Sequence, residues 1–168
     1  MPRDVWERAA LGRGDKVLAS AATTDHTWLL GTRDALLVVS SSVEPVESRL
    51  RIPWERVETA DWDRDKDRLR VAEVADFGQV RPVHEYGVPE PGLLLAMIRE
   101  RVTASVVLQR RVEVSGGGCL RVIARRAPRG NGEVTWAYDF DVDVDPGDPA
   151  VQEAAARGLR AAQDELGP

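Results

Sequence analysis

Five aspartates near the C-terminal end of the chain have the residue type and spacing to hold a divalent cation. They are Asp139, Asp141, Asp143, Asp145 and Asp148. Ca²⁺ and Mg²⁺ bind carboxylate oxygens. A calcium-binding EF-hand loop starting at Asp141 needs glycine at its sixth position and glutamate at its twelfth, where this sequence has Pro146 and Gln152. Both departures argue against an EF-hand.

The alternation of these aspartates with apolar residues favours a solvated strand face instead. Between Val134 and Val144, apolar residues take every second position, which is the period of a β-strand. Arg121 and Arg125 of the preceding predicted strand have the parity to lie opposite the acids. We therefore predict no metal site. The alternative is a metal site on Asp139, Asp141 and Asp143.

Two histidines and one cysteine are the other residues suited to catalysis. His26 follows an aspartate in a predicted turn and His84 precedes a glutamate, but one such neighbour does not make a catalytic triad. Cys119 begins a predicted strand with no histidine near it in the sequence. Gly12-Arg13-Gly14 lacks the third glycine of a dinucleotide-binding motif. We predict no catalytic residue and no cofactor.

Tryptophans and one basic turn provide the candidate partner-binding residues. The chain has five tryptophans, and this residue is common both in cores and at interfaces. Core packing is the main interpretation, and any exposed tryptophan would mark a binding surface. The candidates are Trp28, Trp54 and Trp62, together with Arg126 and Arg129 at a predicted hairpin tip.

The composition argues against several classes of protein. The 168 residues are 43% hydrophobic and 30% charged, the balance of a globular chain and not of a disordered one. A net charge of −5 and a pI of about 5.2 argue against a general nucleic-acid binder. No apolar run is long enough to span a membrane, and the N-terminus lacks an apolar signal region. We expect a cytoplasmic protein with no nucleic-acid or membrane partner.

The first half of the sequence predicts a short helix and then a meander of about five antiparallel strands. The helix is expected over residues 4–11, with Gly12 and Gly14 closing it. The strands are expected over residues 17–21, 27–32, 35–39, 58–62 and 69–74. Pro53 argues against a central strand near residues 51–57, where Trp54 and Val57 have the spacing of one helical turn. Residues 78–91 are expected to be irregular.

The second half predicts a helix, three strands and a final helix. The first helix covers about residues 91–104, and its boundary with the next strand falls between residues 103 and 107. Trp136, Tyr138 and Phe140 are expected to bury their side chains on one face of the last strand. Asp148 and Pro149 begin the final helix, which runs to Leu166. We expect one domain over residues 1–168, with a meander half at about 15–75 and the other elements at about 90–166.

Several segments resemble known families. A family of small, uncharacterised actinobacterial proteins is similar in Gly12-Arg13-Gly14-Asp15-Lys16-Val17-Leu18-Ala19, Trp28, Thr32-Arg33-Asp34-Ala35-Leu36 and Ile52-Pro53-Trp54-Glu55-Arg56-Val57. The order of these segments also resembles the bacterial PH-like domains over about residues 15–75. Those domains begin with an antiparallel meander and end with a helix across a split barrel. The resemblance implies that fold for the N-terminal region and implies no activity.

These observations predict an α+β fold, with an antiparallel, strongly bent sheet or a PH-like split barrel and two main helices. The predicted function is a non-catalytic interaction or ligand-binding module, whose partner is another protein or a second copy of the chain. One alternative is a small hydrolase or metal-dependent enzyme, and another is a structural homodimer subunit. A deep pocket at His84, Cys119 or the aspartates would favour the enzyme, whereas a shallow groove beside a sheet edge would favour the module.

Overall fold

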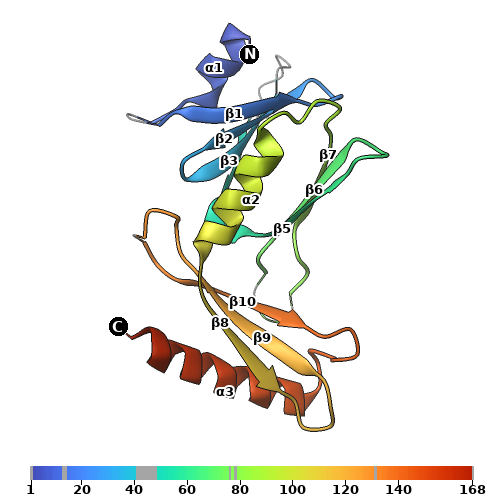
Figure 1. Cartoon of the computed structure of the whole chain (residues 1–168), viewed down its shortest axis with the longest axis vertical. Helices are drawn as coiled ribbons and strands as arrows, with labels where there is room; N and C mark the ends of the chain where they lie inside the picture. Colours follow the sequence, from blue (N-terminus) through green and yellow to red (C-terminus); the bar gives the residue numbers. More distant parts are fainter. Residues whose placement is uncertain are drawn as a thin grey trace.

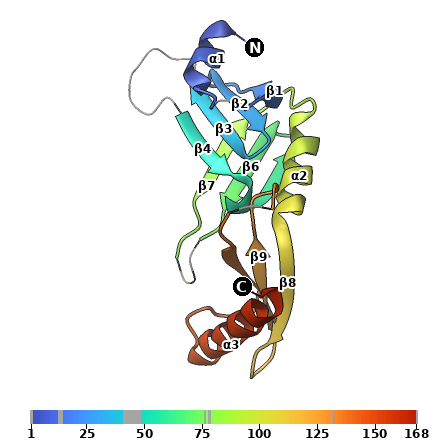
Figure 2. The ribbon, with the colours of Figure 1, turned by 90° about the vertical axis from the view of Figure 1, so that its left-hand side faces the viewer.

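The computed structural model describes residues 2–12, 15–40, 49–75, 77, 79–130 and 132–167. Within them the chain is α+β, with three antiparallel sheets and three helices, which confirms the predicted α+β class and antiparallel pairing but not a single bent sheet (Figure 1). The described strands of each sheet pair only with one another, so the sheets do not close into a barrel. The molecule is elongated, with an N-terminal lobe over residues 3–105 and a C-terminal lobe over residues 106–166 (Figure 2).

The first sheet of the N-terminal lobe pairs four strands in sequence order. They are β1 (Val17–Ala22), β2 (Thr27–Thr32), β3 (Ala35–Ser40) and β4 (Arg49–Pro53). The predicted tight connection at Arg33-Asp34 is confirmed, because β2 and β3 pair on either side of it. Pro53 ends β4, an edge strand, where its missing N–H removes no bond from the sheet interior. The predicted helical turn follows as η1 (Trp54–Arg56).

The second sheet pairs three more consecutive strands. They are β5 (Val57–Asp63), β6 (Arg68–Glu73) and β7 (Val83–Gly87). The prediction that residues 78–91 are irregular is wrong, since β7 lies within them. Prolines flank β7 and do not interrupt it, and the Glu73 N–H donates to the Pro82 carbonyl (2.9 Å) beside the β6–β7 ladder. Seven strands thus precede the second helix, where about five are expected from the sequence.

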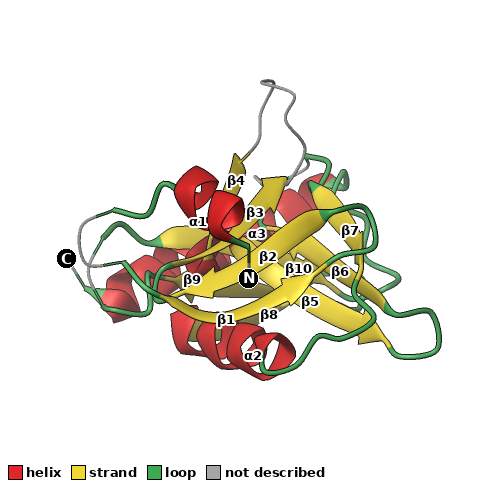
Figure 3. Ribbon diagram, turned by 90° about the horizontal axis from the view of Figure 1, so that it is seen from above, coloured by secondary structure: helices red, strands yellow, loops and turns green. Residues whose placement is uncertain are grey.

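Two helices cover parts of the N-terminal lobe, α1 (Arg3–Ala9) and α2 (Leu94–Ser105). The helix α1 packs on β3, and its C-cap is Ala10 in the left-handed conformation, not the predicted Gly12, while Gly14 lies outside the described residues. The helix α2 packs on β1, β2, η1 and β5, along one side of the sheets (Figure 3). It buries Leu94 and Ile98, which lie one helical turn apart on the same face. The strand β8 begins at Val106, directly after α2 and within the predicted range.

The C-terminal lobe consists of one sheet and one helix. Its strands are β8 (Val106–Glu113), β9 (Cys119–Arg125) and β10 (Thr135–Phe140), in the order β10-β9-β8. The helix α3 (Pro149–Leu166) packs on β8 and β9. Asp148 caps it as predicted, because its Oδ1 accepts from the Ala150 N–H (2.7 Å). Gly158 permits a close approach, since a Cβ there would lie 2.5 Å from a methyl carbon of Val112.

The predicted acidic strand is shorter than its alternating sequence. The strand β10 ends at Phe140, and residues 141–147 form turns in which the Val144 N–H donates to the Asp141 carbonyl (3.0 Å). Pairing stops there because the partner strand, β9, begins at Cys119, opposite that end of β10. Val142, predicted to face the core, is fully exposed.

Aromatic side chains on β10 are less buried than predicted. Trp136, Tyr138 and Phe140 are half-buried and pack against the C-terminal core, whereas Ala137 on the opposite face is buried. The helix α3 covers β8 and β9 and leaves the aromatic face of β10 partly open.

Separate hydrophobic clusters fill the two lobes. The N-terminal cluster gathers large side chains around Trp54 and Leu29, and the C-terminal cluster packs Leu120 and Val122 against small residues of α3. A smaller cluster at the junction consists of Val74, Val106, Ile123 and Ala137. The single domain remains a prediction. No helix in the described ranges is long and apolar enough to cross a membrane.

Candidate binding groove

The structure separates the aspartates of the predicted acidic row. Asp139 forms the predicted ion pair with Arg121. Asp141 lies beyond the strand, where its Oδ2 accepts from the Cys119 N–H (3.0 Å), and Asp143 is exposed in the following turn. Among the described residues, no three His, Cys, Asp or Glu side chains form a group that could hold a metal ion.

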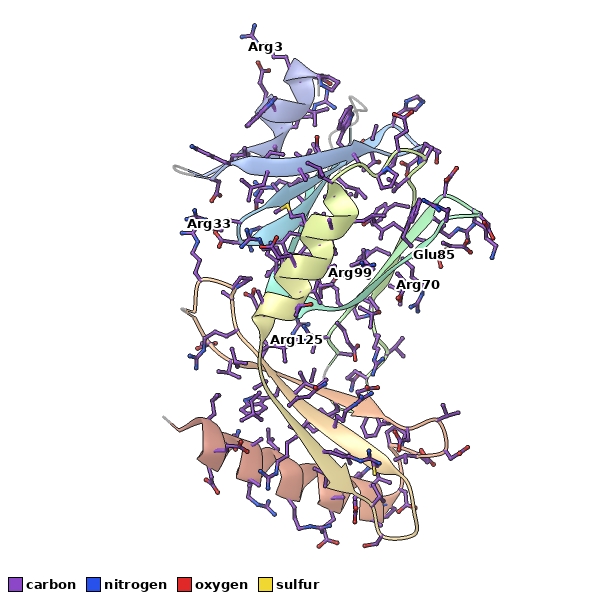
Figure 4. The ribbon with its side chains drawn as sticks, viewed as in Figure 1. Arg3, Arg33, Arg70, Glu85, Arg99 and Arg125 are labelled. Atoms are coloured by element: carbon purple, nitrogen blue, oxygen red, sulfur yellow. The ribbon has the colours of Figure 1, made fainter. Side chains whose placement is uncertain are left out.

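The prediction that Arg125 faces these aspartates is wrong, because Arg125 lies buried between the lobes (Figure 4). Its guanidinium donates to the Ser105 Oγ (2.9 Å) and to the Glu58 carbonyl (3.1 Å). Side chains alternate along a strand, so Arg125 lies on the same face of β9 as Arg121 and Ile123. The N-terminal lobe covers that end of the face, however, since Ile123 packs there against Val74.

The basic hairpin tip also contacts the N-terminal lobe. Arg129 donates through Nε and Nη2 to the two carboxylate oxygens of Asp34, at 2.7 and 2.6 Å. Arg126 is half-buried, and its backbone N–H donates to the Ser105 carbonyl (2.8 Å). Both residues therefore help to join the lobes, and their role in binding a partner stays a prediction.

The candidate tryptophans differ in their environments. Trp54 is fully buried, and its indole N–H donates to the Thr32 carbonyl (3.0 Å). Trp28 and Trp62 are half-buried, with the guanidinium of Arg64 5.9 Å from the Trp62 ring centroid. Trp6 in α1, which the sequence analysis does not single out, is 47% exposed.

The histidine with catalytic interest, His84, belongs to a partly buried cluster in the N-terminal lobe. Its Nε2 lies 2.7 Å from the Glu73 Oε1, and its ring stacks on Tyr86 with centroids 6.5 Å apart. Burial, together with the Asp25 and Glu73 carboxylates, raises the pKa of Tyr86 to about 12. Cys119 lies in the other lobe, where its Sγ accepts from the Arg111 Nε (3.1 Å). The structure therefore does not bring His84 and Cys119 together.

A cavity of about 570 Å³ opens between the two lobes. One wall is formed by described residues between β6 and β7 in the N-terminal lobe, and the other is formed by β10, the turn that follows it and the start of α3. The lining residues are Ala75, Phe77, Gln79, Arg81, Tyr138, Phe140, Asp145, Pro146, Gly147 and Gln152. We call this cavity the inter-lobe groove.

Three aromatic rings line the inter-lobe groove. Phe77 meets Tyr138 and Phe140 edge-on, with centroids 5.1 and 5.7 Å apart, and the latter two rings stack on the same face of β10. Edge-to-face pairs of this kind hold each ring in a defined orientation. Burial raises the pKa of Tyr138 above the ordinary value of 10. The groove thus presents a preformed aromatic surface.

An arginine on the groove wall is already engaged with protein groups. The Arg81 Nε lies 3.0 Å from the Glu58 Oε2, and its Nη2 donates to the Tyr138 carbonyl (3.1 Å). The first contact is an ion pair by distance, but its geometry falls short of a hydrogen bond. Burial raises the pKa of Glu58, and the opposing effect of Arg81 is the smaller one. Arg81 therefore links β5 of one lobe to β10 of the other.

Apolar surface extends beyond the inter-lobe groove on both sides. A second hollow of about 350 Å³ shares Phe77, Tyr138 and Gln152 and continues along α3 to Leu159. Val80 and Val142, next in the sequence to groove-lining residues, are 93% and 101% exposed, but neither lines the groove. An open, concave aromatic surface is typical of an interaction site.

Comparison of the chain with protein-family models, with curated proteins and with solved structures found no match. The resemblances to the actinobacterial family and to the PH-like domains therefore stay predictions. The inter-lobe groove has to be interpreted from its own geometry.

Sequence reasoning missed the residues that define the groove, above all Phe77, Arg81 and Gln152. Phe77 is one of only two phenylalanines in the chain, and it stands in a connection rather than in a strand. The sequence signal that could have indicated Phe77 is the presence of an aromatic residue in a polar connection. Its partners Tyr138 and Phe140 are some sixty residues away in the sequence, so pairing them requires the fold.

Proposed function

We propose that this protein is a non-catalytic, cytoplasmic interaction module that binds a segment of a partner protein in the inter-lobe groove. The observation that carries the proposal is the open aromatic surface of Phe77, Tyr138 and Phe140 at the junction of the two lobes. Ligand sites are common at such junctions. A groove beside an edge strand suits a peptide segment, and β10 is one of the two edge strands of its sheet.

The chemistry of the groove walls supports binding over catalysis. Arg81 is engaged by Glu58 and the Tyr138 carbonyl, and Asp145 accepts the Gly147 N–H (2.8 Å) within its own turn. Burial raises the pKa of Tyr138 above 10, further from neutral pH than that of an ordinary tyrosine. A general acid or base needs a pKa near the working pH and access to its substrate. These side chains instead hold the walls in place.

We also propose that the N-terminal lobe is a PH-like scaffold. Its antiparallel strands, four in one sheet and three in the next, are followed by α2, and this order supports the likeness. The turn between β1 and β2 has no lysine or arginine with which to bind a phosphorylated head group. The proposed partner is accordingly a protein, and not a membrane or a nucleic acid.

Site-specific photocrosslinking tests the proposed site. A benzoylphenylalanine placed at Gln79, on the groove wall, should yield adducts that map to one partner segment. The same group at Gln109, an exposed glutamine of β8, is the matched control. The crosslinked segment, synthesised as a peptide, should bind the wild-type chain about tenfold more tightly than Phe77→Ala, because a central aromatic contributes strongly to an interface.

Two results would contradict the proposal. One is equal crosslinking from Gln79 and Gln109. The other is unchanged peptide affinity in a Phe77→Ala variant whose circular dichroism and melting temperature match the wild type. Phe77 is half-buried in a connection, so the variant is expected to fold.

A further inference from the structure

The turn between β10 and α3 forms an acidic edge of the inter-lobe groove. Residues 141–148 contain four aspartates and no lysine or arginine. Two of the four have structural roles, since Asp148 caps α3 and Asp141 accepts the Cys119 N–H. Asp143 and Asp145 form no ion pair with any described residue, and Asp145 itself lines the groove.

Arginines near this edge have other partners, and among the described residues none forms an ion pair with Asp143 or Asp145, although Arg111 interacts electrostatically with Asp141. Arg81 pairs with Glu58, and Arg121 pairs with Asp139. Arg111 donates to the Cys119 Sγ. The wall that α3 contributes adds Gln152 and small apolar residues, with no charge. The edge therefore keeps a negative charge beside an aromatic surface.

Aromatic rings and carboxylates together select a particular kind of occupant. The faces of Tyr138 and Phe140 attract a cation, and a planar guanidinium stacks on such rings while it donates to a carboxylate. Phe77 and Ala75 on the opposite wall offer contacts for an aliphatic side chain. A phosphate or an acidic peptide would instead place negative charge against Asp143 and Asp145, while Arg81, the one cation among the lining residues, is already paired with Glu58.

We propose that the occupant of the inter-lobe groove is a basic segment of a partner protein, in which arginine or lysine flanks an aliphatic side chain. This inference rests on the proposed function, because it assumes that the groove is the binding site. The aliphatic side chain packs on the apolar surface that Phe77 and the rings of β10 form together. The flanking cation lies over those rings and pairs with Asp145 and Asp143.

Nuclear magnetic resonance titration of the full, nitrogen-15-labelled chain tests the charge of the occupant. The probes are three acetylated, amidated pentapeptides: Ala-Arg-Leu-Arg-Ala, Ala-Gln-Leu-Gln-Ala and Ala-Glu-Leu-Glu-Ala. At millimolar concentration, the arginine peptide should shift the amide signals of Phe77, Tyr138 and Gln152 most strongly. Its affinity should fall as salt is raised, because exposed ion pairs are screened.

A double variant, Asp143→Asn with Asp145→Asn, links the affinity to the acidic edge. Asparagine keeps the side-chain oxygen that accepts the Gly147 N–H, so the turn is retained. We expect the double variant to lower the affinity for the arginine peptide about threefold or more, which is the combined effect of losing two exposed ion pairs. The matched control, Asp61→Asn with Asp164→Asn, removes two exposed carboxylates elsewhere and should leave the affinity unchanged.

The outcomes distinguish this inference from the proposed function. Equal or tighter binding of the glutamine or glutamate peptide at the groove residues would overturn the inference on charge and leave the groove as the binding site. Equal weakening in both double variants would also overturn it, since a general charge effect would then explain the affinity. If none of the peptides shifts the groove signals, the inference fails and the crosslinking experiment alone decides the proposed function.

Discussion

The N-terminal lobe encloses its large apolar side chains between two sheets and a helix, whereas the C-terminal lobe has one sheet and one helix to cover its own. Trp54, Leu29 and Leu36 are fully buried in the first lobe. In the second, α3 contacts the sheet through alanines and Gly158, and Trp136, Tyr138 and Phe140 stay half-buried. The first lobe is therefore suited to be a scaffold, whereas the second keeps apolar surface available for a partner.

The largest difference between the lobes should appear when a large core side chain is removed. Trp54→Ala should lower the free energy of unfolding by about 3–5 kcal/mol, because it leaves a cavity and an unpaired Thr32 carbonyl. Phe140→Ala should cost less, about 1–2 kcal/mol, because part of that ring is already in contact with water. Urea unfolding of both variants measures the two values. Equal losses would contradict the comparison.

The next effect concerns the close contact between α3 and its sheet. Glycine to alanine in a helix usually stabilises by about 1 kcal/mol. Gly158→Ala should instead destabilise by about 1 kcal/mol net, because the new Cβ would lie 2.5 Å from a methyl carbon of Val112. Ala156→Gly, an exposed position on the same helix, should also destabilise by about 1 kcal/mol. A stabilised Gly158→Ala variant would show that the interface has room.

Each lobe contains one of the two tyrosines. Burial raises the pKa of a tyrosine hydroxyl, so the two pKa values compare the burial of the two rings. Tyr86 should ionise near pH 12, and Tyr138 also above the ordinary value of 10. The unfolded chain ionises its tyrosines first, so the folded state loses stability as pH rises from about 10 towards 12. Ultraviolet titration of Tyr86→Phe should remove the higher step and Tyr138→Phe the lower one. The reverse assignment would contradict the comparison.

At the junction between the lobes, the ionisation of Glu58 should change the free energy of unfolding at acidic pH, by less than the tyrosines do at alkaline pH. Burial raises the pKa of Glu58 above 4.5, so the folded state binds the proton more tightly than the unfolded state does. This contribution to stability is complete at low pH and is lost as pH rises through the raised pKa. Glu58→Gln should flatten that part of the profile of unfolding free energy against pH. Glu90→Gln, at an exposed position, is the control, and identical profiles for both variants would refute the assignment.

The smallest expected effect is that of divalent cations. Millimolar Ca²⁺ or Mg²⁺ should leave the melting temperature unchanged, because Asp139, Asp141 and Asp143 do not converge. A bound ion at tenfold excess over its Kd would add about 1.4 kcal/mol, which thermal melting resolves. A calcium-specific rise that Asp141→Asn abolishes would support the metal-dependent alternative.

Local patterns predicted most strands and helices of both lobes. Residues 27–32 form β2 as expected, and Asp148 with Pro149 begins α3, because capping and short hairpins depend on neighbours in the sequence. β7 was missed because its prolines suggest an irregular segment, and its pairing with β6 spans a long connection. The acidic strand was extended too far because alternation says nothing of where the partner strand ends.

The binding groove was not predicted, since its two walls come from different lobes. Phe77 and Tyr138 meet because the β6–β7 connection extends towards the C-terminal lobe. The misplacement of Arg125 has the same origin, because only the docked N-terminal lobe turns an exposed face of β9 into a buried one. Tertiary contacts of this kind leave no periodic signal in the sequence.

The order of the strands has a consequence for how the chain folds. In all three sheets, every strand pairs with its neighbour in sequence. Local pairing of this kind favours fast folding, because little chain entropy is lost before each contact forms. The Arg129–Asp34 pair, in contrast, joins residues 95 positions apart. We expect each sheet to form early and the contacts between lobes to form last, so that slow folding phases report on the junction.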